Sequence, residues 1–126
     1  MTTDAATVVD GFLAAICDND LERALGYCAA DIEYDNVPIG PVVGHDGVRQ
    51  ILGPLLAGAS RVEWIIHHQL ASGDVVMNTR LDRFEIGEGW LELPVAGVFE
   101  VSDGKITLWR DYFDLGTFQS QFTGSA

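Results

Sequence analysis

The stretch 74–85, DVVMNTRLDRFE, indicates a β-strand that places charged residues among apolar ones. Successive side chains of a strand point to opposite faces of a sheet. Arg80 and Asp82 therefore share the face of Phe84, whereas Arg83 lies on the other face. Because an unpaired buried charge is costly, a chain rarely keeps one without a partner or a use. We therefore expect a functional site on the face of Arg80 and Asp82.

A second stretch, 105–113 or KITLWRDYF, repeats this pattern. Asp111 shares a face with Trp109 and Phe113, and Arg110 takes the other face. Together the two stretches place two carboxylates and one guanidinium on faces that are otherwise apolar.

The rest of the second half of the chain also alternates, and glycine-containing turns separate its strands. The predicted strands are Arg61–Ala71, Asp74–Glu85, Trp90–Val101 and Lys105–Phe113, with turns at Ser72-Gly73, Gly87–Gly89 and Asp103-Gly104. Connections this short join neighbouring antiparallel strands, so this half predicts a meander.

The first half shows helical periodicity instead. The predicted helices are Thr3–Cys17, Leu21–Cys28 with Asp20 as its N-cap, and a third after Gly44 that bends or ends near Pro54. Three smaller features complete the prediction: a strand at Asp31–Val37, a strand-end or cap role for Asp114, and a closing helix around Phe118 and Phe122. Helices followed by a meander predict an α+β domain in which helices cover one face of a bent sheet.

Length and charge limit the possible partners. The 126 residues, of which 48% are hydrophobic, fit one domain that spans residues 1–126. The net charge of −12 and the scattered positions of seven Lys and Arg residues argue against a nucleic-acid or membrane partner. No apolar run reaches membrane-spanning length and no leader-like segment is seen, so a cytoplasmic protein is expected.

The sequence offers no metal or cofactor signature. Cys17 and Cys28 are too few for a disulfide framework, and we interpret both as helical core residues. The histidines do not cluster at ligand spacing, and the glycines lack a dinucleotide-binding pattern, so neither metal nor cofactor is expected. His68 has the strand parity of Trp64 and could reach a pocket, whereas His45 is expected beside a helix cap.

Strand parity defines one candidate polar site. An inward face would hold Tyr34, Asn36, Arg80, Asp82 and Asp111, and an outward face Glu33, Asp35, Arg83 and Arg110. The pattern equally fits reversed faces or a buried ion pair of purely structural use. Chemistry favours the inward site, because Arg80 can keep one carboxylate ionised while burial favours a proton on the other. A base beside an acid is what one-step addition of water requires.

The chain resembles the limonene-1,2-epoxide hydrolase family at several short motifs. These are Tyr34-x-Asn36, Arg80-x-Asp82, Trp109–Asp114, the strand Gly97–Glu100 and the turn Asp103–Ile106. The resemblance runs from about Ala5 to Phe122. It implies a cone-shaped α+β fold like that of nuclear transport factor two, in which three to four helices cover a curved antiparallel or mixed sheet around a deep central pocket.

The resemblance also implies a role for each polar residue. Asp111 would be the general base that takes a proton from water, and Tyr34 and Asn36 would hold that water with it. Asp82 would be the general acid that protonates the epoxide oxygen, and Arg80 would bridge the two carboxylates. No covalent enzyme intermediate forms in this mechanism, and the product is a vicinal diol.

The expected substrates are water and a small to medium apolar epoxide of terpene or cycloalkene type. The residues expected to bind it are Leu55, Trp64, Leu93, Val95 and Phe113. The family is dimeric, and the outward Leu108, Arg110 and Tyr112 form a mixed surface that a homodimer could use. The segment between Asp82 and Gly97 differs from the family pattern, which leaves the identity of the epoxide open.

Two other function classes remain open. A ketosteroid isomerase- or polyketide cyclase-like enzyme of the same fold would use an Asp base, and a non-catalytic member would only bind an apolar ligand. Arg80 favours hydrolysis over isomerisation, because a protonated Asp in an isomerase is expected in an apolar setting without an adjacent cation. A pure binder has no need of two buried Asp residues around an Arg.

Overall fold

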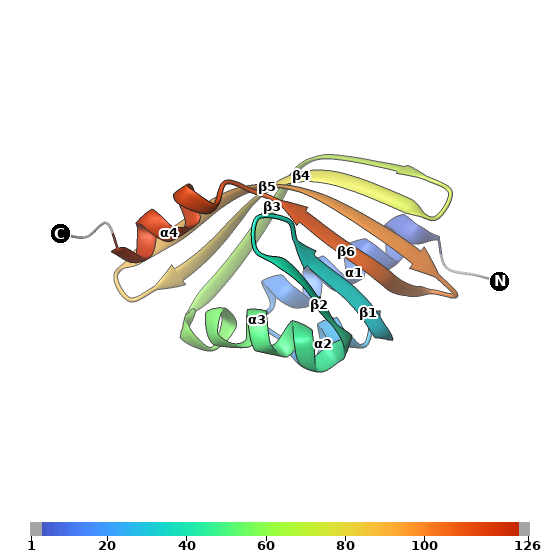
Figure 1. Cartoon of the computed structure of the whole chain (residues 1–126), viewed down its shortest axis with the longest axis horizontal. Coiled ribbons are helices and arrows are strands. Elements are labelled where there is room, and N and C mark those ends of the chain that lie inside the picture. Colours follow the sequence, from blue (N-terminus) through green and yellow to red (C-terminus); the bar gives the residue numbers. More distant parts are fainter. Residues whose placement is uncertain (1–3, 124–126) are drawn as a thin grey trace.

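The computed structural model describes residues 4–123 and contains four helices and six strands in this range. The elements in chain order are α1 (Ala5–Cys17), α2 (Leu21–Leu25), β1 (Cys28–Asn36), β2 (Gly40–Val43), α3 (Gly44–Gly58), β3 (Arg61–Ser72), β4 (Val75–Ile86), β5 (Gly89–Ser102), β6 (Lys105–Tyr112) and α4 (Leu115–Thr123). Figure 1 shows the helices α1, α2 and α3 against one face of the sheet and α4 beside β5.

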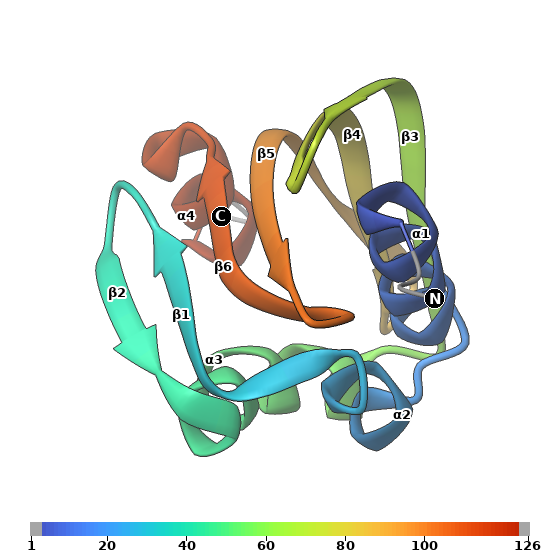
Figure 2. The same cartoon turned by 90° about the vertical axis from the view of Figure 1, so that its right-hand side faces the viewer.

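The six strands form a single sheet in the order β2-β1-β6-β5-β4-β3. All neighbouring strands are antiparallel except β1 and β6, which are parallel. Figure 2 shows that the sheet is strongly curved. The predicted α+β class, with a curved mixed sheet covered by three to four helices, is therefore confirmed.

The core lies between the concave face of the sheet and the helices. Phe12 of α1 is fully buried and packs edge-on against Trp109 of β6, with ring centroids 4.9 Å apart. Phe99 of β5 stacks on the same indole at 6.2 Å. These large side chains fix the distance between α1 and the sheet, because interiors are packed at crystal-like density.

Helix α1 begins where a capping side chain permits it. The carboxylate of Asp4 accepts a hydrogen bond from the backbone N–H of Thr7 at 2.8 Å, so Asp4 is the N-cap and the helix starts at Ala5. The predicted start at Thr3 lies outside the described residues. Asp114 likewise accepts from the backbone N–H of Thr117 at 2.8 Å and caps the first turn of α4, as predicted.

The second helix is shorter than predicted, and this changes the place of Cys28. The helix α2 ends at Leu25, and Cys28 is the first residue of β1, paired with Ile106 of β6. The prediction of a helical Cys28 was wrong because pairing with a distant strand overrides local propensity. Cys28 is nevertheless buried, as expected of a core side chain.

The connection from β1 to α3 contains the strand β2, which the sequence did not predict. The strand β2 pairs only with β1 and forms an edge of the sheet. Pro41 lies within it, and proline is tolerated at an edge because the missing N–H faces outward. Helix α3 continues past Pro54 to Gly58, so it does not end near Pro54, and the alternative of a bend there stays a prediction. Pro54 is on the exposed side of α3, where solvent can take up the carbonyl it leaves unpaired.

Candidate active site

Five polar side chains are buried on the concave face of the sheet. They are Asn36, Asn78, Arg80, Asp82 and Asp111, and none is more than 6% exposed. Tyr34, at 3%, is buried among them. The inward parity assignment is therefore correct in its geometry, and it omitted one member of the group, Asn78.

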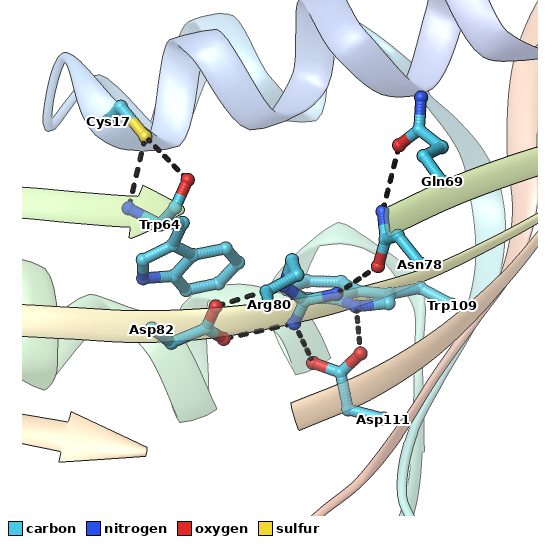
Figure 3. A network of polar contacts seen from close by, with 8 residues as sticks. All are labelled: Cys17, Trp64, Gln69, Asn78, Arg80, Asp82, Trp109 and Asp111. Carbon is cyan, nitrogen blue, oxygen red and sulfur yellow. Dashed lines mark hydrogen bonds and ion pairs between the residues drawn. The ribbon is translucent and has the colours of Figure 1, made fainter. Parts of the chain in front are cut away.

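Arg80 joins the two carboxylates directly. Its Nε and Nη2 donate to Oδ1 and Oδ2 of Asp82, both at 2.9 Å, in a fork-like pair. Nη2 also donates to Oδ2 of Asp111 at 2.9 Å. Figure 3 shows the guanidinium between the two acidic groups, which come from β4 and β6.

Strand register brings these residues together. In the parallel pair of β1 and β6, Asn36 lies opposite Asp111. In the antiparallel pair of β5 and β6, Gly97 lies opposite Asp111. A Cβ at Gly97 would lie 2.5 Å from Nη1 of Arg80 and 2.9 Å from Oδ1 of Asp111. Only glycine leaves room for the guanidinium to reach from β4 across β5 to β6.

The residues assigned to the outward face form ion pairs of their own, which the sequence analysis did not predict. Arg110 contacts Asp35 at 3.0 Å and Glu33 at 3.7 Å. Arg83 pairs with Glu63 of β3 and with Glu92 of β5. The two faces of the sheet therefore hold separate charge networks.

The electrostatics of the site distinguish its members. Burial raises the pKa of Asp82 to about 6 against the opposing effect of Arg80, and the charge of Asp111 raises it further. Burial lowers the pKa of Arg80, but Asp111 and Asp82 together raise it above its ordinary value, so the guanidinium stays charged. Burial also raises the pKa of Tyr34, which keeps its hydroxyl protonated. Asp82 is thus suited to hold a proton at mildly acidic pH, up to about 6.

Trp109 contacts both halves of the site and was assigned no site role from the sequence. Its Nε1 donates to Oδ1 of Asp111 at 2.9 Å. Its ring stacks on Tyr34 with centroids 3.8 Å apart and planes 9° from parallel. The alternation of 105–113 placed Trp109 on the face of Asp111, but a strand pattern cannot show that the indole nitrogen reaches that carboxylate.

A cavity of about 60 Å³ opens beside the carboxylates. Its lining includes Tyr34, Asn36, Asp82 and Asp111 together with all five side chains expected to bind substrate, Leu55, Trp64, Leu93, Val95 and Phe113. Arg80 contacts the two carboxylates but does not line this cavity. Five further apolar residues complete the wall: Ile39, Ile51, Leu52, Phe84 and Phe118. The expected depth of the pocket stays a prediction.

The histidines lie away from this cavity. The pairing of β3 with β4 shifts register between Ile66 and His68, and such a bulge reverses the alternation beyond it. His68 is consequently exposed, with Nδ1 3.3 Å from Oγ1 of Thr79, and the prediction that it could reach the pocket was wrong. His45, in the first turn of α3, has Nε2 3.0 Å from the carbonyl oxygen of Cys28.

Within residues 4–123, no group of three or more His, Cys, Asp and Glu side chains is arranged to hold a metal ion. In the same range, no helix has the length and apolar character needed to cross a membrane.

The curved mixed sheet with helices on its concave face is a nuclear-transport-factor-two-like fold. Two solved structures share it at low identity. A protein described as NTF2-like from Cytophaga hutchinsonii has a TM-score of 0.74 at 15% identity, covering 90% of this chain and 93% of its own. A protein with a ketosteroid isomerase-like fold from Catenulispora acidiphila has a TM-score of 0.77 at 21% identity, covering 90% of both chains.

The chain belongs to the limonene-1,2-epoxide hydrolase family, whose catalytic-domain model matches residues 3–123. The epoxide hydrolase EphG of Mycobacterium tuberculosis is 37% identical over 107 residues, covering 85% of this chain and 71% of its own. The structure of an LEH-like epoxide hydrolase from M. tuberculosis has a TM-score of 0.78 at 33% identity, covering 98% of both chains. The family predicted from the sequence motifs is confirmed.

Proposed function

We propose that this protein is an epoxide hydrolase that adds water to a small to medium apolar epoxide and releases a vicinal diol. One observation carries the proposal: Arg80 holds two buried carboxylates, Asp82 and Asp111, at the wall of an otherwise apolar cavity. Membership of the family and the likeness to EphG, which is named an epoxide hydrolase, support the reaction class.

The proposed reaction takes one step. Asp111 removes a proton from a water molecule held by Tyr34 and Asn36, and the water oxygen forms a bond to one epoxide carbon. The bond between that carbon and the ring oxygen breaks, and Asp82 donates a proton to the oxygen. Asp111 gains one proton and Asp82 loses one, so the summed charge of Arg80, Asp82 and Asp111 is the same before and after the step. A proton then returns from Asp111 to Asp82 before the next turnover.

The asymmetry of the two carboxylates supports these roles. Asp82 accepts two hydrogen bonds from Arg80 and has a pKa raised to about 6, mainly by burial, so a substantial fraction is protonated near that pH. Asp111 accepts instead from Arg80 and from Trp109, and its carboxylate lies at the wall of the cavity. The register of β1 and β6 sets Asn36 opposite this proposed base.

The apolar wall supports a terpene- or cycloalkene-type epoxide. Leu55, Leu93, Val95 and Phe113 surround the carboxylates and offer no hydrogen bond from their side chains. Such a wall favours a hydrocarbon skeleton by the hydrophobic effect, and Trp64 limits its bulk.

A screen of limonene, cyclohexene and styrene oxides, with chiral analysis of the diols, tests the activity and ranks substrates. A single turnover in oxygen-18 water tests the mechanism, because direct attack places label in the diol at once. Label appearing first in the protein would instead reveal an enzyme ester. Absence of diol from every epoxide, with the folded protein still binding the epoxides, would favour the non-catalytic alternative.

The isomerase and cyclase alternatives have less support. Structures with those fold descriptions are less than 25% identical to this chain and share only its architecture. The charged Arg80 against both carboxylates also differs from the apolar setting that an isomerase acid needs.

We further propose that residues 1–126 form a single domain and that the protein acts as a homodimer in the cytoplasm. Leu70, Met77 and Tyr112 are exposed apolar side chains that line one surface hollow, and Tyr112 also belongs to the predicted contact surface with Leu108 and Arg110. Light scattering after size-exclusion chromatography tests the dimer, and cell fractionation tests the location. A monomer at micromolar concentration would contradict the proposed homodimer.

A further inference from the structure

Asn78 is the one buried polar residue of the site to which the proposed mechanism gives no role. It lies on β4, two residues before Arg80 and on the same face. Its Oδ1 accepts from Nη1 of Arg80 at 3.0 Å, which is a third contact of the guanidinium after those with Asp82 and Asp111. The buried amide of Asn78 therefore contacts the same guanidinium that holds the two carboxylates.

Asn78 belongs to a chain of hydrogen bonds that leaves the site and reaches helix α1. Its Nδ2 donates to Oε1 of Gln69 at 3.0 Å, and Nε2 of Gln69 donates to Oδ1 of Asp10 at 2.9 Å. Figure 3 shows the part from Gln69 through Asn78 to Arg80. The links connect β4, β3 and α1.

The residues at the two ends of this series of hydrogen bonds, Asp10 and Arg80, determine which group donates and which accepts at each link. The carboxylate of Asp10 only accepts hydrogen bonds, and the guanidinium of Arg80 only donates them. An amide can be turned either way, but here each has a single satisfying orientation, with its NH2 toward Asp10 and its oxygen toward Arg80. Gln69 therefore prevents Asn78 from turning its NH2 toward the cation.

The third acceptor of Arg80, Oδ1 of Asn78, carries no formal charge, and this affects how the guanidinium is shared. Asp82 and Asp111 already place two potential negative charges on Arg80, and a third carboxylate would compete with them for the guanidinium. Without any acceptor, a buried N–H of Arg80 would be left unpaired. An amide oxygen satisfies Nη1 without drawing the cation away from the acid and the base.

We infer that Asn78 is a positioning residue, oriented by Gln69 and Asp10, that holds the Arg80 guanidinium where it bridges Asp82 and Asp111. The inference rests on the proposed function for its kinetic readout. It also predicts a physical property of Arg80 that does not depend on activity.

The comparison of Asn78→Leu with wild type tests this inference, since leucine has a similar volume and no acceptor. We expect kcat to fall roughly 10- to 100-fold with KM changed less than about threefold, in the range seen when partners of functional groups are removed. We also expect the pH above which kcat/KM falls to rise, because an Arg80 held less firmly opposes the effect of burial on Asp82 less. The charge of Asp111 also raises the pKa of Asp82, and the charge of Asp82 in turn raises the pKa of the Tyr34 hydroxyl and of the half-buried Cys17 thiol. The variant leaves all of these groups in place.

Three further variants separate positioning from general stability. Gln69→Leu leaves Asn78 in place but frees its amide to turn, so it should change kcat in the same direction and by less. Asn78→Asp restores an acceptor with a charge and should not recover wild-type kcat. Thr79→Val changes a neighbouring exposed residue whose side chain, within residues 4–123, forms a hydrogen bond with His68 alone. This variant should leave kcat and the pH profile unchanged.

Hydrogen exchange of the Arg80 Nε–H, followed by NMR, gives the readout that needs no substrate. This proton is buried and donated to Asp82 in the folded protein, so it should be protected in wild type. Protection should fall at least tenfold in Asn78→Leu while backbone amides of β4 stay protected. Unchanged Nε–H protection, or an unchanged pH profile with only a lower Tm, would overturn the inference. If no epoxide is hydrolysed by wild type but Nε–H protection falls as expected, only the proposed function fails.

Discussion

Asp82 and Asp111 accept hydrogen bonds from the same nitrogen atom, Nη2 of Arg80, each at 2.9 Å. The two carboxylates lie on different strands, β4 and β6, with β5 between them. One cation therefore contacts both the proposed general acid and the proposed general base.

Replacement of Asp111 by asparagine should abolish diol formation, because an amide cannot take the proton from water. We expect kcat to fall about 10²- to 10⁴-fold, the usual contribution of a general base. Diol release measured by gas chromatography is the assay. Circular dichroism and retention of an inert apolar ligand are the controls, and substantial residual turnover would remove Asp111 from the role of base.

Asp82 should control the pH dependence of both activity and stability. Its pKa of about 6 in the folded protein, against 3.8 for a free side chain, means that kcat/KM should fall as pH rises through about 6, since the acid loses its proton. Between pH 4 and 6 the folded state holds a proton that the unfolded chain releases, so the free energy of unfolding should fall as pH rises, by on the order of 3 kcal/mol.

The variant Asp82→Asn separates these effects. It should lose at least 100-fold in kcat and also lose the decline in stability between pH 4 and 6. Urea denaturation at pH 4, 5, 6 and 7 measures this decline. A slope that persists in Asp82→Asn would mean that another group binds the proton.

Gly97→Ala should impair both activity and stability. The new methyl group would lie 2.5 Å from Nη1 of Arg80 and 2.9 Å from Oδ1 of Asp111, so the side chains of the site itself must move. Overpacking of this kind costs about 1–3 kcal/mol, and the displaced guanidinium should lower kcat at least tenfold. Gly89→Ala on the same strand is the matched control, because its Cβ would have no atom within 4 Å. Equal kcat in both variants would contradict the close packing at Gly97.

Trp109→Phe should weaken catalysis through orientation. Phenylalanine can keep a ring stacked on Tyr34 but loses the bond from Nε1 to Asp111. A hydrogen bond to a charged group contributes about 1.5–3 kcal/mol, so kcat should fall roughly 10- to 100-fold. Steady-state kinetics beside thermal unfolding checks this, and a fall in Tm with normal kcat would restrict Trp109 to packing.

Trp64→Leu should change which epoxides are accepted. The indole lines the cavity and lies over Arg80, 5.1 Å from its Cζ to the ring centroid, and among the described residues its Nε1 has no hydrogen-bond acceptor. Removal of this ring enlarges the cavity and should cost about 2 kcal/mol of stability. The ratio of kcat/KM for limonene oxide to that for cyclohexene oxide should rise. An unchanged ratio would place the limit on substrate size elsewhere.

Parity explains why the polar site could be placed from the sequence. Strand side chains alternate with period two, so Arg80 and Asp82 had to share a face, as did Tyr34 and Asn36. Parity alone also fitted reversed faces, and the chemistry of a base beside an acid favoured the inward assignment. The assignment then needed no knowledge of how the strands pair.

The features that the sequence analysis missed depend on which strands pair or on which side chains come into contact. The bulge near His68 arises where β3 meets β4, and the strand β2 exists because β1 offers it an edge. Asn78 shows the parity of Arg80, but a neutral side chain gave no reason to look for a partner. Its role is visible only once Gln69 is seen to fix its amide.

The parallel pairing of β1 with β6 has a consequence for how the chain folds. Arg80 and Asp82 lie on one strand and can meet as soon as β4 forms, but Asp111 reaches them only when β6 inserts between β1 and β5. The pairing of β1 with β6 closes a loop that contains all the elements from β2 to β5, and this closure costs conformational entropy. Folding also slows as contacts become less local. We therefore expect the contact between Arg80 and Asp82 to form early in folding and Asp111 to join them last. Recovery of activity during refolding should then have the same rate constant as completion of the sheet.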